Sequence, residues 1–95
     1  MNGKARRHLR GLGHHLEPVV RVGQAGVTEG VIRAAEVALL DHELIKVRVR
    51  EAPENQKVVG AKLAEACDAE LVQVLGKTFL LYRAHPEEPK IKLPD

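Results

Sequence analysis

Hydrophobic residues recur at helical spacing near the start of the chain, over residues 4–14. The apolar positions are spaced by four, three and four residues: Ala5, Leu9, Leu12 and Leu16. They predict a short basic helix that docks its apolar stripe on the core and ends near two glycines, Gly11 and Gly13. Three arginines lie off the stripe and are expected to project into solvent or toward a ligand: Arg6, Arg7 and Arg10.

The period of the hydrophobic pattern changes after Pro18. There a run of β-branched residues predicts a first strand that stops at Gly23. Helical spacing resumes after Gly26, and Thr28 is expected to cap the new helix. That helix is expected to end near His42, and its inward face to carry Val31, Ala35, Ala38 and Leu39.

The clearest alternation in the chain is IKVRVR, residues 45–50, with aliphatic side chains on one face and cations on the other. This pattern predicts a half-buried strand. Pro53 then begins a third predicted helix, which is expected to end near Cys67. The core face of that helix is expected to comprise Val59, Leu63 and Ala66.

Two apolar runs, residues 70–75 and 78–83, lie on either side of Gly76-Lys77. A two-residue loop with glycine first predicts a type II′ turn and therefore an antiparallel hairpin. Residues 84–95, rich in proline and charge, predict an extended or partly disordered tail. The order αβαβαββ predicts one two-layer α/β domain over residues 1–95, with a four-stranded mixed sheet and right-handed crossovers.

The amino-acid composition limits the kinds of partner that the chain is expected to bind. Aromatic residues make up only 2% of the 95 residues, so aliphatic side chains must fill one modest core. Phe79 and Tyr82 are too few for a site built on stacking against bases. Residues 1–50 carry nine Lys and Arg against five Asp and Glu, net +4, whereas residues 51–95 carry six against eight, net −2. The basic first half favours an anionic partner, although an unevenly charged solvated surface gives the same totals.

The residue types that metal centres and active sites require are scarce. Cys67 is the only cysteine, and its helical spacing from Leu63 predicts a small buried hydrophobe. The five histidines show no zinc-ligand spacing, and the chain contains no serine. We therefore expect no catalysis, no metal and no cofactor. No apolar run approaches the roughly 18 residues that cross a bilayer, so we expect a soluble cytoplasmic protein without a membrane partner.

The loop Gly23-Gln24-Ala25-Gly26 carries the main functional signal, because it joins a predicted strand to a predicted helix. Glycines allow positive φ and close approach of a ligand, and the free N–H groups of the next helix's first turn suit phosphate oxygens. The signal is weak alone, since a strand-to-helix turn also needs glycine for steric reasons. Gln24 and Ala25 carry no charge, so cations elsewhere must supply most of the attraction.

The sequence therefore predicts a composite site for an RNA backbone. Its candidate residues are the loop itself with Thr28 at the helix start, and the cations Lys4, Arg6, Arg7, Arg10, Arg21, Lys46 and Lys77. A helix that covered the cationic face of residues 45–50 would separate Lys46, Arg48 and Arg50 from the loop, so the alternation alone does not place all three beside it.

Longer motifs resemble a known family. The runs LEPVVRVGQAGVTEGV, HELIKVRV and GKTFLLYR look like the YhbY-type proteins, single-domain bacterial members of the chloroplast RNA splicing and ribosome maturation (CRM) domain family. The resemblance covers nearly the whole chain. It implies a fold similar to the C-terminal domain of translation initiation factor three, and an RNA-binding GxxG loop like that of KH domains. It also implies a role on ribosomal RNA of large-subunit precursors during ribosome assembly.

Two other functions are compatible with the sequence. The chain could be an adaptor that meets a ribosomal protein or assembly factor through a sheet face or the alanine-rich second helix. DNA binding is a more distant alternative, because no helix presents an evident set of base-reading side chains.

Overall fold

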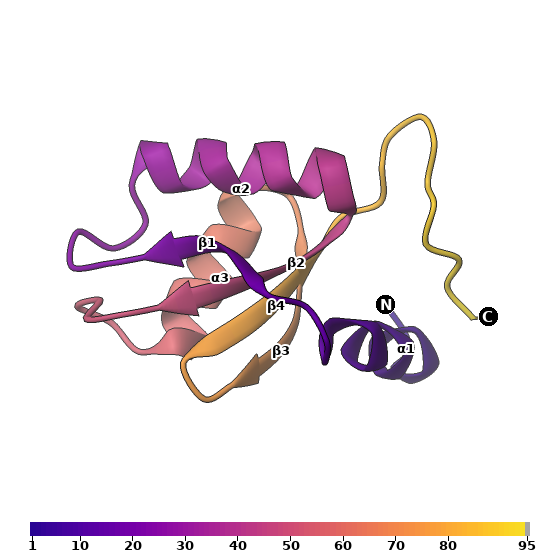
Figure 1. Ribbon diagram of the computed structural model, residues 1–95, viewed down its shortest axis with the longest axis horizontal. Helices are drawn as coiled ribbons and strands as arrows, with labels where there is room; N and C mark the ends of the chain where they lie inside the picture. Colours follow the sequence, from indigo (N-terminus) through magenta and orange to yellow (C-terminus); the bar gives the residue numbers. More distant parts are fainter. Residues whose placement is uncertain (95) are drawn as a thin grey trace.

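The computed structural model describes residues 1–94, and its helices and strands follow the order αβαβαββ (Figure 1). The elements are α1 (Gly3–Gly13), β1 (Pro18–Val22), α2 (Glu29–His42), β2 (Leu44–Val49), α3 (Gln56–Ala66), β3 (Glu70–Leu75) and β4 (Thr78–Tyr82). The predicted succession of elements is thus confirmed.

The strands form one mixed sheet in the order β1-β2-β4-β3. β1 pairs with β2 in parallel through the crossover helix α2, whereas β4 runs antiparallel to both β2 and β3. The predicted four-stranded mixed sheet is confirmed. Because β1 and β2 are parallel, their carboxyl ends lie at the same edge, and the β3–β4 turn joins them there through a hydrogen bond from Val49 N to Lys77 O, 2.7 Å.

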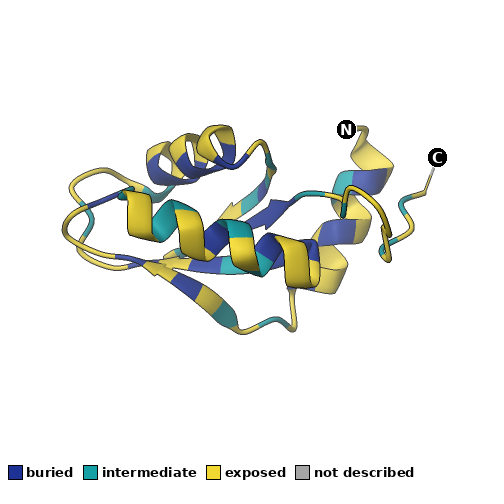
Figure 2. Ribbon diagram, turned by 90° about the horizontal axis from the view of Figure 1, so that it is seen from above, coloured by how far each residue is buried: buried dark blue, intermediate teal, exposed yellow. Residues whose placement is uncertain are grey.

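The main core lies between one face of the sheet and the helices α2 and α3. β2 contributes Ile45, Val47 and Val49 to it, as its alternation predicts. Cys67 is buried in the same cluster, as predicted, and burial raises the pKa of its thiol. α2 and α3 turn their buried residues toward the sheet and their exposed residues to solvent (Figure 2).

α1 packs on the opposite face of the sheet, where Leu9 forms a second, smaller core with Leu44, Val72, Leu80 and Tyr82. The fold therefore has the two predicted layers, the sheet and the helices α2 and α3, and α1 adds a third layer over part of the outer face of the sheet. The face of α1 that docks follows the row Ala5, Leu9 and Gly13. The expectation that Leu12 docks is wrong: Leu12 lies to one side of this row and is 43% exposed.

The third helix begins at Gln56, later than the predicted start at Pro53, because the side chain of Asn55 caps it. Asn55 Oδ1 accepts from Val58 N at 3.0 Å, the bond expected of an N-cap. Ala66, expected in the core, is exposed, and Ala64 is buried instead.

Two other predicted local features are confirmed. Thr28 caps α2, with its hydroxyl oxygen accepting from Val31 N at 3.2 Å. In the hairpin turn Gly76 has a φ of 60° and Lys77 does not share the left-handed conformation, which agrees with a type II′ turn.

The tail after β4 is extended, as predicted, but it is held to the body by Glu43, a buried carboxylate at the end of α2. Glu43 accepts backbone N–H bonds from His85 at 2.7 Å and from Lys90 and Ile91 at 2.8 Å. Ile91 and Leu93 then pack on the second core. The expectation of partial disorder is therefore not met over residues 84–94.

The docking of α1 predicts opposite effects for its two internal glycines. A Cβ at Gly13 would overlap the side chain of Leu80, whereas a Cβ at Gly11 meets nothing within 4 Å. Gly13→Ala should lower the free energy of unfolding by about 1–3 kcal/mol through overpacking. Gly11→Ala should raise it by about 0.5–1 kcal/mol, since alanine favours helix. Urea denaturation of both variants checks this, and equal effects would contradict the docking of α1 against Leu80.

The Glu43 clamp predicts a specific loss of stability in acid. Burial by itself raises the pKa of Glu43, but the N–H donors of His85, Ile91 and Lys90 and the charge of His85 outweigh it and lower the pKa. The stabilisation is therefore complete above the ordinary carboxyl pKa of about 4.3 and is lost as pH falls through the lower folded-state pKa.

Glu43→Gln should cost about 1–3 kcal/mol at neutral pH, and the difference from wild type should shrink in acid. Thermal unfolding between neutral pH and strong acid measures both effects. Glu87→Gln, an exposed carboxylate in the same tail, is the control and should change little. A gap between Glu43→Gln and wild type that stayed constant with pH would contradict the clamp.

Candidate nucleic-acid interface

The Gly23–Gly26 loop connects β1 to α2 at one end of the molecule (Figure 1). Gly26 adopts a φ of +72° and donates its N–H to Gly23 O at 2.9 Å, which closes a tight turn. Within residues 1–94 no hydrogen bond engages the N–H groups of Gln24 or Ala25. The loop thus presents free amide donors beside the positive end of the α2 dipole.

Two other connections lie at the same end as this loop. The β2–α3 connection packs on it, since a Cβ at Gly26 would stand 3.7 Å from Pro53 Cγ. Gln24 Nε2 donates to Glu51 Oε2 at 3.0 Å, which holds a carboxylate next to the loop. A hollow in the surface here is lined in part by Arg50, Glu51 and Lys77. The hairpin turn that carries Lys77 therefore borders the loop end of the sheet.

The outer face of the sheet carries cations next to this end. In the parallel register of β1 and β2, Arg21 stands directly against Arg48, and both side chains are exposed. Neighbouring strands are about 4.8 Å apart, so two like-charged side chains leave the sheet from adjacent positions on the same face. The ion pairs found among residues 1–94 engage Arg6, Lys62 and Arg83, and none of them neutralises Arg21 or Arg48.

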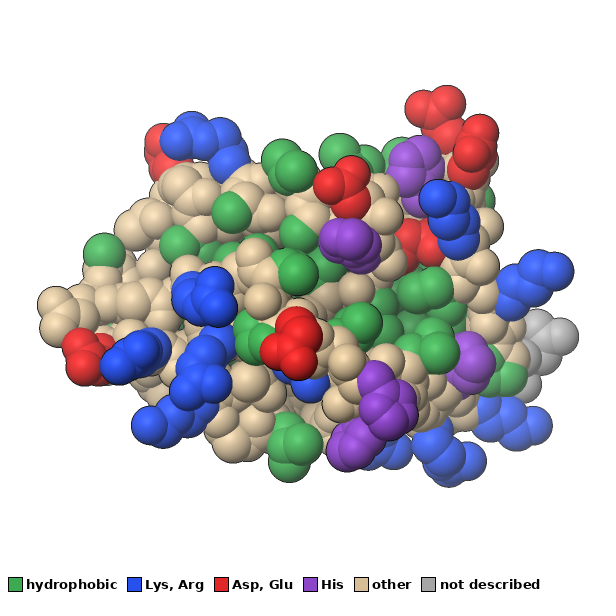
Figure 3. Space-filling model, viewed as in Figure 1, with side chains coloured by type: hydrophobic (Ala, Val, Ile, Leu, Met, Phe, Trp, Pro, Cys, Tyr) green, Lys and Arg blue, Asp and Glu red, His purple; other side chains and the backbone are tan. Residues whose placement is uncertain are grey.

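We call Arg21, Arg48, Arg50 and Lys77 the loop-end cations. Lys46, which precedes Arg48 on the same face, is half-buried and lies beside His14 and Leu16 in the connection that follows α1. The structure thus brings Arg21, Lys77 and the loop together and places Lys46 at the border of the area that α1 covers. Figure 3 shows Lys and Arg side chains gathered at the loop end of this face.

The cations of α1 lie away from the loop. Lys4, Arg7 and Arg10 are exposed, but their helix covers the opposite end of the sheet from the Gly23–Gly26 loop (Figure 1). Figure 3 shows Lys and Arg side chains around that end as well, with histidines between the two groups. The predicted site is therefore divided into two groups of cations rather than one continuous patch around the loop.

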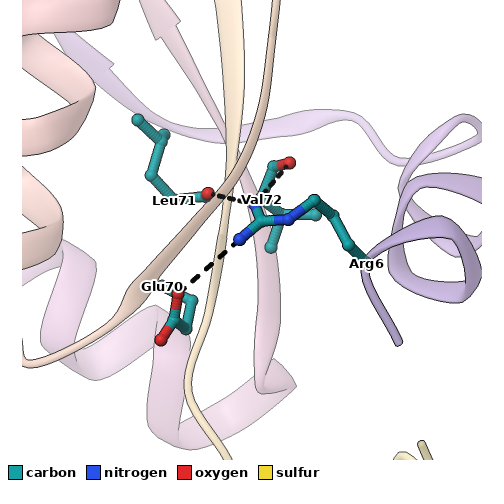
Figure 4. Close-up of polar contacts among 4 residues, drawn as sticks. All are labelled: Arg6, Glu70, Leu71 and Val72. Atoms are coloured by element: carbon teal, nitrogen blue, oxygen red, sulfur yellow. Dashed lines mark hydrogen bonds and ion pairs between the residues drawn. The ribbon is translucent and has the colours of Figure 1, made fainter. Parts of the chain in front are cut away.

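The Arg6 side chain is hydrogen-bonded to the protein backbone and is not free for a ligand, contrary to expectation. Its Nη1 donates to Leu71 O at 2.7 Å and to Val72 O at 3.1 Å, and Nη2 lies 4.0 Å from Glu70 Oε2 (Figure 4). The expectation that Arg6 projects into solvent or toward a ligand is wrong, because its guanidinium ties α1 to the edge strand β3.

The residues that sequence reasoning left outside the site are Arg48 and Arg50. Their alternation with Val47 and Val49 shows that they share a face with Lys46. Whether they are open to solvent beside the loop depends on which part of that face α1 covers. The alternation of residues 45–50 cannot predict where α1 packs.

Within residues 1–94 no three His, Cys, Asp or Glu residues come together as a metal site. None of the helices there has both the length and the apolar character to span a membrane.

Comparison with known proteins identifies the family. The sequence profile of the CRS1/YhbY (CRM) domain matches residues 1–83. This chain belongs to the CRS1/YhbY (CRM) domain family. The family resemblance found in the sequence is therefore confirmed, and the interface described above is that of a CRM-family chain.

Relatives of this CRM-family chain include proteins named for RNA binding. An RNA-binding protein of Haemophilus influenzae is 45% identical over 96 residues, covering 99% of this chain and 95% of that protein. A probable RNA-binding protein of Methanocaldococcus jannaschii is 46% identical over 86 residues, 87% of this chain, and the chain spans 63% of its length. The solution structure of a Staphylococcus aureus protein, a candidate RNA-binding protein, matches with a TM-score of 0.83 and 37% identity over 99% of each chain.

The two glycines in the loop of this CRM-family chain differ in backbone conformation, so alanine should have a different effect on stability at each. Gly26→Ala should cost about 1 kcal/mol or more, because alanine is strained at a φ of +72°. Gly23→Ala should change the free energy of unfolding by less than about 0.5 kcal/mol, since φ is ordinary there and the nearest atom to a new Cβ is Arg50 O at 4.0 Å. Chemical denaturation checks both values, and a Gly23→Ala variant less stable than Gly26→Ala would contradict this loop conformation.

Proposed function

We propose that this protein binds RNA through its Gly23–Gly26 loop and the loop-end cations, and that the ligand atoms it contacts are mainly backbone phosphates. The observation that carries the proposal is the Arg21–Arg48 pair, two exposed arginines that are direct partners in the register of β1 and β2 and have no acidic partner within 4 Å among residues 1–94. Like charges directly opposite each other are unfavourable in the free protein. A bound polyanion removes that cost.

The loop and the cations have different parts in this proposal. The free amides of Gln24 and Ala25 can donate to phosphate oxygens, and the absence of a side chain at Gly23 lets the backbone approach. Arg21 and Arg48 supply charge, which gives most of the affinity of a phosphate-directed site. Glu51 opposes the phosphate charge, so its bond to Gln24 limits the positive potential at the loop.

The exposed cations of α1, Lys4, Arg7 and Arg10, form a second contact in the same proposal. They lie away from the loop, so they would bind a different stretch of the RNA backbone. Thr28 acts through the α2 start that it caps, and Arg6 through the position of α1 that it holds.

We propose ribosomal RNA of large-subunit precursors as the ligand, and a non-catalytic role in ribosome assembly in the cytoplasm. Support comes from the YhbY-type motifs of the sequence and from relatives that are named RNA-binding proteins. Residues 1–95 would act as one RNA-binding unit, without a cofactor or a membrane partner. Crosslinking in cells, followed by sequencing of the attached RNA, tests the ligand, and crosslinks outside ribosomal RNA would contradict it.

The Arg21–Arg48 pair predicts that affinity and stability change in opposite directions. Arg21→Gln and Arg48→Gln should each weaken RNA binding and reduce the slope of log K against log salt by about 0.7–0.9. Each should also leave the free protein equally stable or a few tenths of a kcal/mol more stable, because a like-charge contact is removed. Fluorescence anisotropy over a salt series and thermal denaturation measure the two effects.

Arg33→Gln is the matched control, because Arg33 is exposed on α2, on the other face of the sheet, and takes part in none of the ion pairs found among residues 1–94. It removes one positive charge away from the outer face and should leave the salt slope unchanged. If Arg33→Gln and Arg48→Gln lost equal affinity, net charge alone would explain the effect, and a site at the loop end would be contradicted.

One observation favours an additional adaptor role. Val37 and Leu40 of α2 are 61% and 46% exposed, which leaves apolar surface on the alanine-rich helix. If a ribosomal protein or assembly factor docks there, Val37→Lys should abolish association with ribosomal particles while Arg48→Gln retains it. The reverse result favours RNA as the main contact.

A further inference from the structure

We infer that the preferred ligand of this interface is base-paired RNA, contacted along the phosphate backbones of a stem, rather than the exposed bases of a single strand. The inference rests on the proposed function and specifies its ligand class. It follows from which side chains reach the surface and where the two groups of cations lie.

The first argument is the lack of an exposed Phe, Tyr or Trp ring. The chain has one Phe, one Tyr and no Trp. Phe79 and Tyr82 are 1% and 7% exposed, because both belong to the cores on the two faces of the sheet. Proteins that hold single strands gain about 1–3 kcal/mol per base from stacking on such rings. This protein has no Phe, Tyr or Trp ring with which to gain it.

Histidine rings are the flat side chains nearest to the interface. His14 and His15 contact each other edge to face, with ring centroids 5.1 Å apart, directly after α1. They lie outside the loop-end cations, with His14 beside the half-buried Lys46. Apart from the carboxylate of Glu51, the polar groups next to the loop are therefore guanidinium and ammonium groups and free amides, which bind phosphate.

The second argument concerns the order of the ligand before binding. A single strand must lose conformational freedom to align its phosphates with fixed cations, and here no stacking offsets that loss. A stem already holds its phosphates in a regular array and hides the faces of its bases. A site that binds phosphates and not bases therefore loses no contact when the bases are paired in a stem, and it binds a ligand whose phosphates are already ordered.

The third argument is the division of the cations into two groups. Lys and Arg side chains gather at the loop end and around α1, and both groups are visible on one face (Figure 3). The longest extent of the protein is 38 Å, and α1 and the loop lie toward its two ends (Figure 1). A stem presents two backbones across a groove, so separate phosphate rows can meet the two groups at once. A flexible single strand reaches both groups only after the segment between them loses its conformational freedom.

The test compares three RNA probes against the full chain by fluorescence anisotropy at one low salt concentration. They are a hairpin stem of about 16 base pairs, a second stem of unrelated sequence, and an unstructured single strand with the same number of nucleotides as the first stem. Both stems should bind with similar affinity and about tenfold or more tighter than the single strand, a difference of about 1.4 kcal/mol.

Equal or tighter binding of the single strand would overturn the inference and leave the proposed function in place. Failure of all three probes to bind would contradict the proposed function itself. His14→Ala with His15→Ala controls for stacking on histidine, and a selective loss of single-strand binding in that variant would also count against the inference.

A pair of variants tests the two-group contact. Arg7→Gln with Arg10→Gln should weaken stem binding by a larger factor than single-strand binding, because the stem presents phosphates to both groups in one fixed array. Arg33→Gln with Lys57→Gln, on α2 and α3, removes the same charge from the other side of the sheet and should affect both probes little. An equal loss on stem and single strand for the α1 variant would overturn simultaneous contact.

Discussion

The parallel pairing of β1 with β2 is the constraint from which the interface follows. Two adjacent parallel strands require a crossover, which α2 provides, and their carboxyl ends must lie at one edge of the sheet. That edge therefore collects the Gly23–Gly26 loop and the start of the β2–α3 connection. The same register sets Arg21 against Arg48, and an antiparallel arrangement of these strands would separate the loop from the β2 carboxyl end.

The outer face of the sheet has a part that α1 covers and a part that is open to solvent. Over one part, Leu9 of α1 closes a small core with apolar residues of β2, β3 and β4. Over the other part, the alternation of β2 continues but its outward residues are cations left in solvent. Close approach of α1 at Gly13 and the bonds from Arg6 to β3 hold this boundary. The end of the helix therefore limits the area open to a ligand.

Charged side chains occur in two opposite environments in this fold, as the exposed pair Arg21 and Arg48 and the buried Glu43 show. Glu43 is buried, and three N–H donors from the tail satisfy its carboxylate, so its charge stabilises the fold. Arg21 and Arg48 are exposed and face each other, so their charges do not stabilise the free protein. Retaining charge that costs stability is expected at surfaces used for binding, where function and stability make different demands.

Much of the molecule could be predicted from its sequence, because local patterns determine local structure. The change of period at Pro18, the alternation of residues 45–50 and the Gly76-Lys77 turn all gave elements that the structure contains. The GxxG loop was also evident, since its glycines lie at a boundary between a strand and a helix. The start of the third helix was predicted wrongly: proline is common at the first helical position, which favours Pro53, but Asn55 caps the helix through its bond from Val58 N and the helix begins at Gln56.

What the tertiary structure alone decided is which surfaces remain open. Arg6, Arg7 and Arg10 look alike in sequence, yet Arg6 binds the carbonyls of residues far along the chain, and helical spacing carries no information about such partners. The docking of the extended tail was likewise unpredictable, because its anchor, the carboxylate of Glu43, is distant in sequence. Sequence determines periodicity and therefore which face of an element is apolar. Only packing determines what lies against that face, and here it separated the α1 cations from the loop while placing Arg48 beside Arg21.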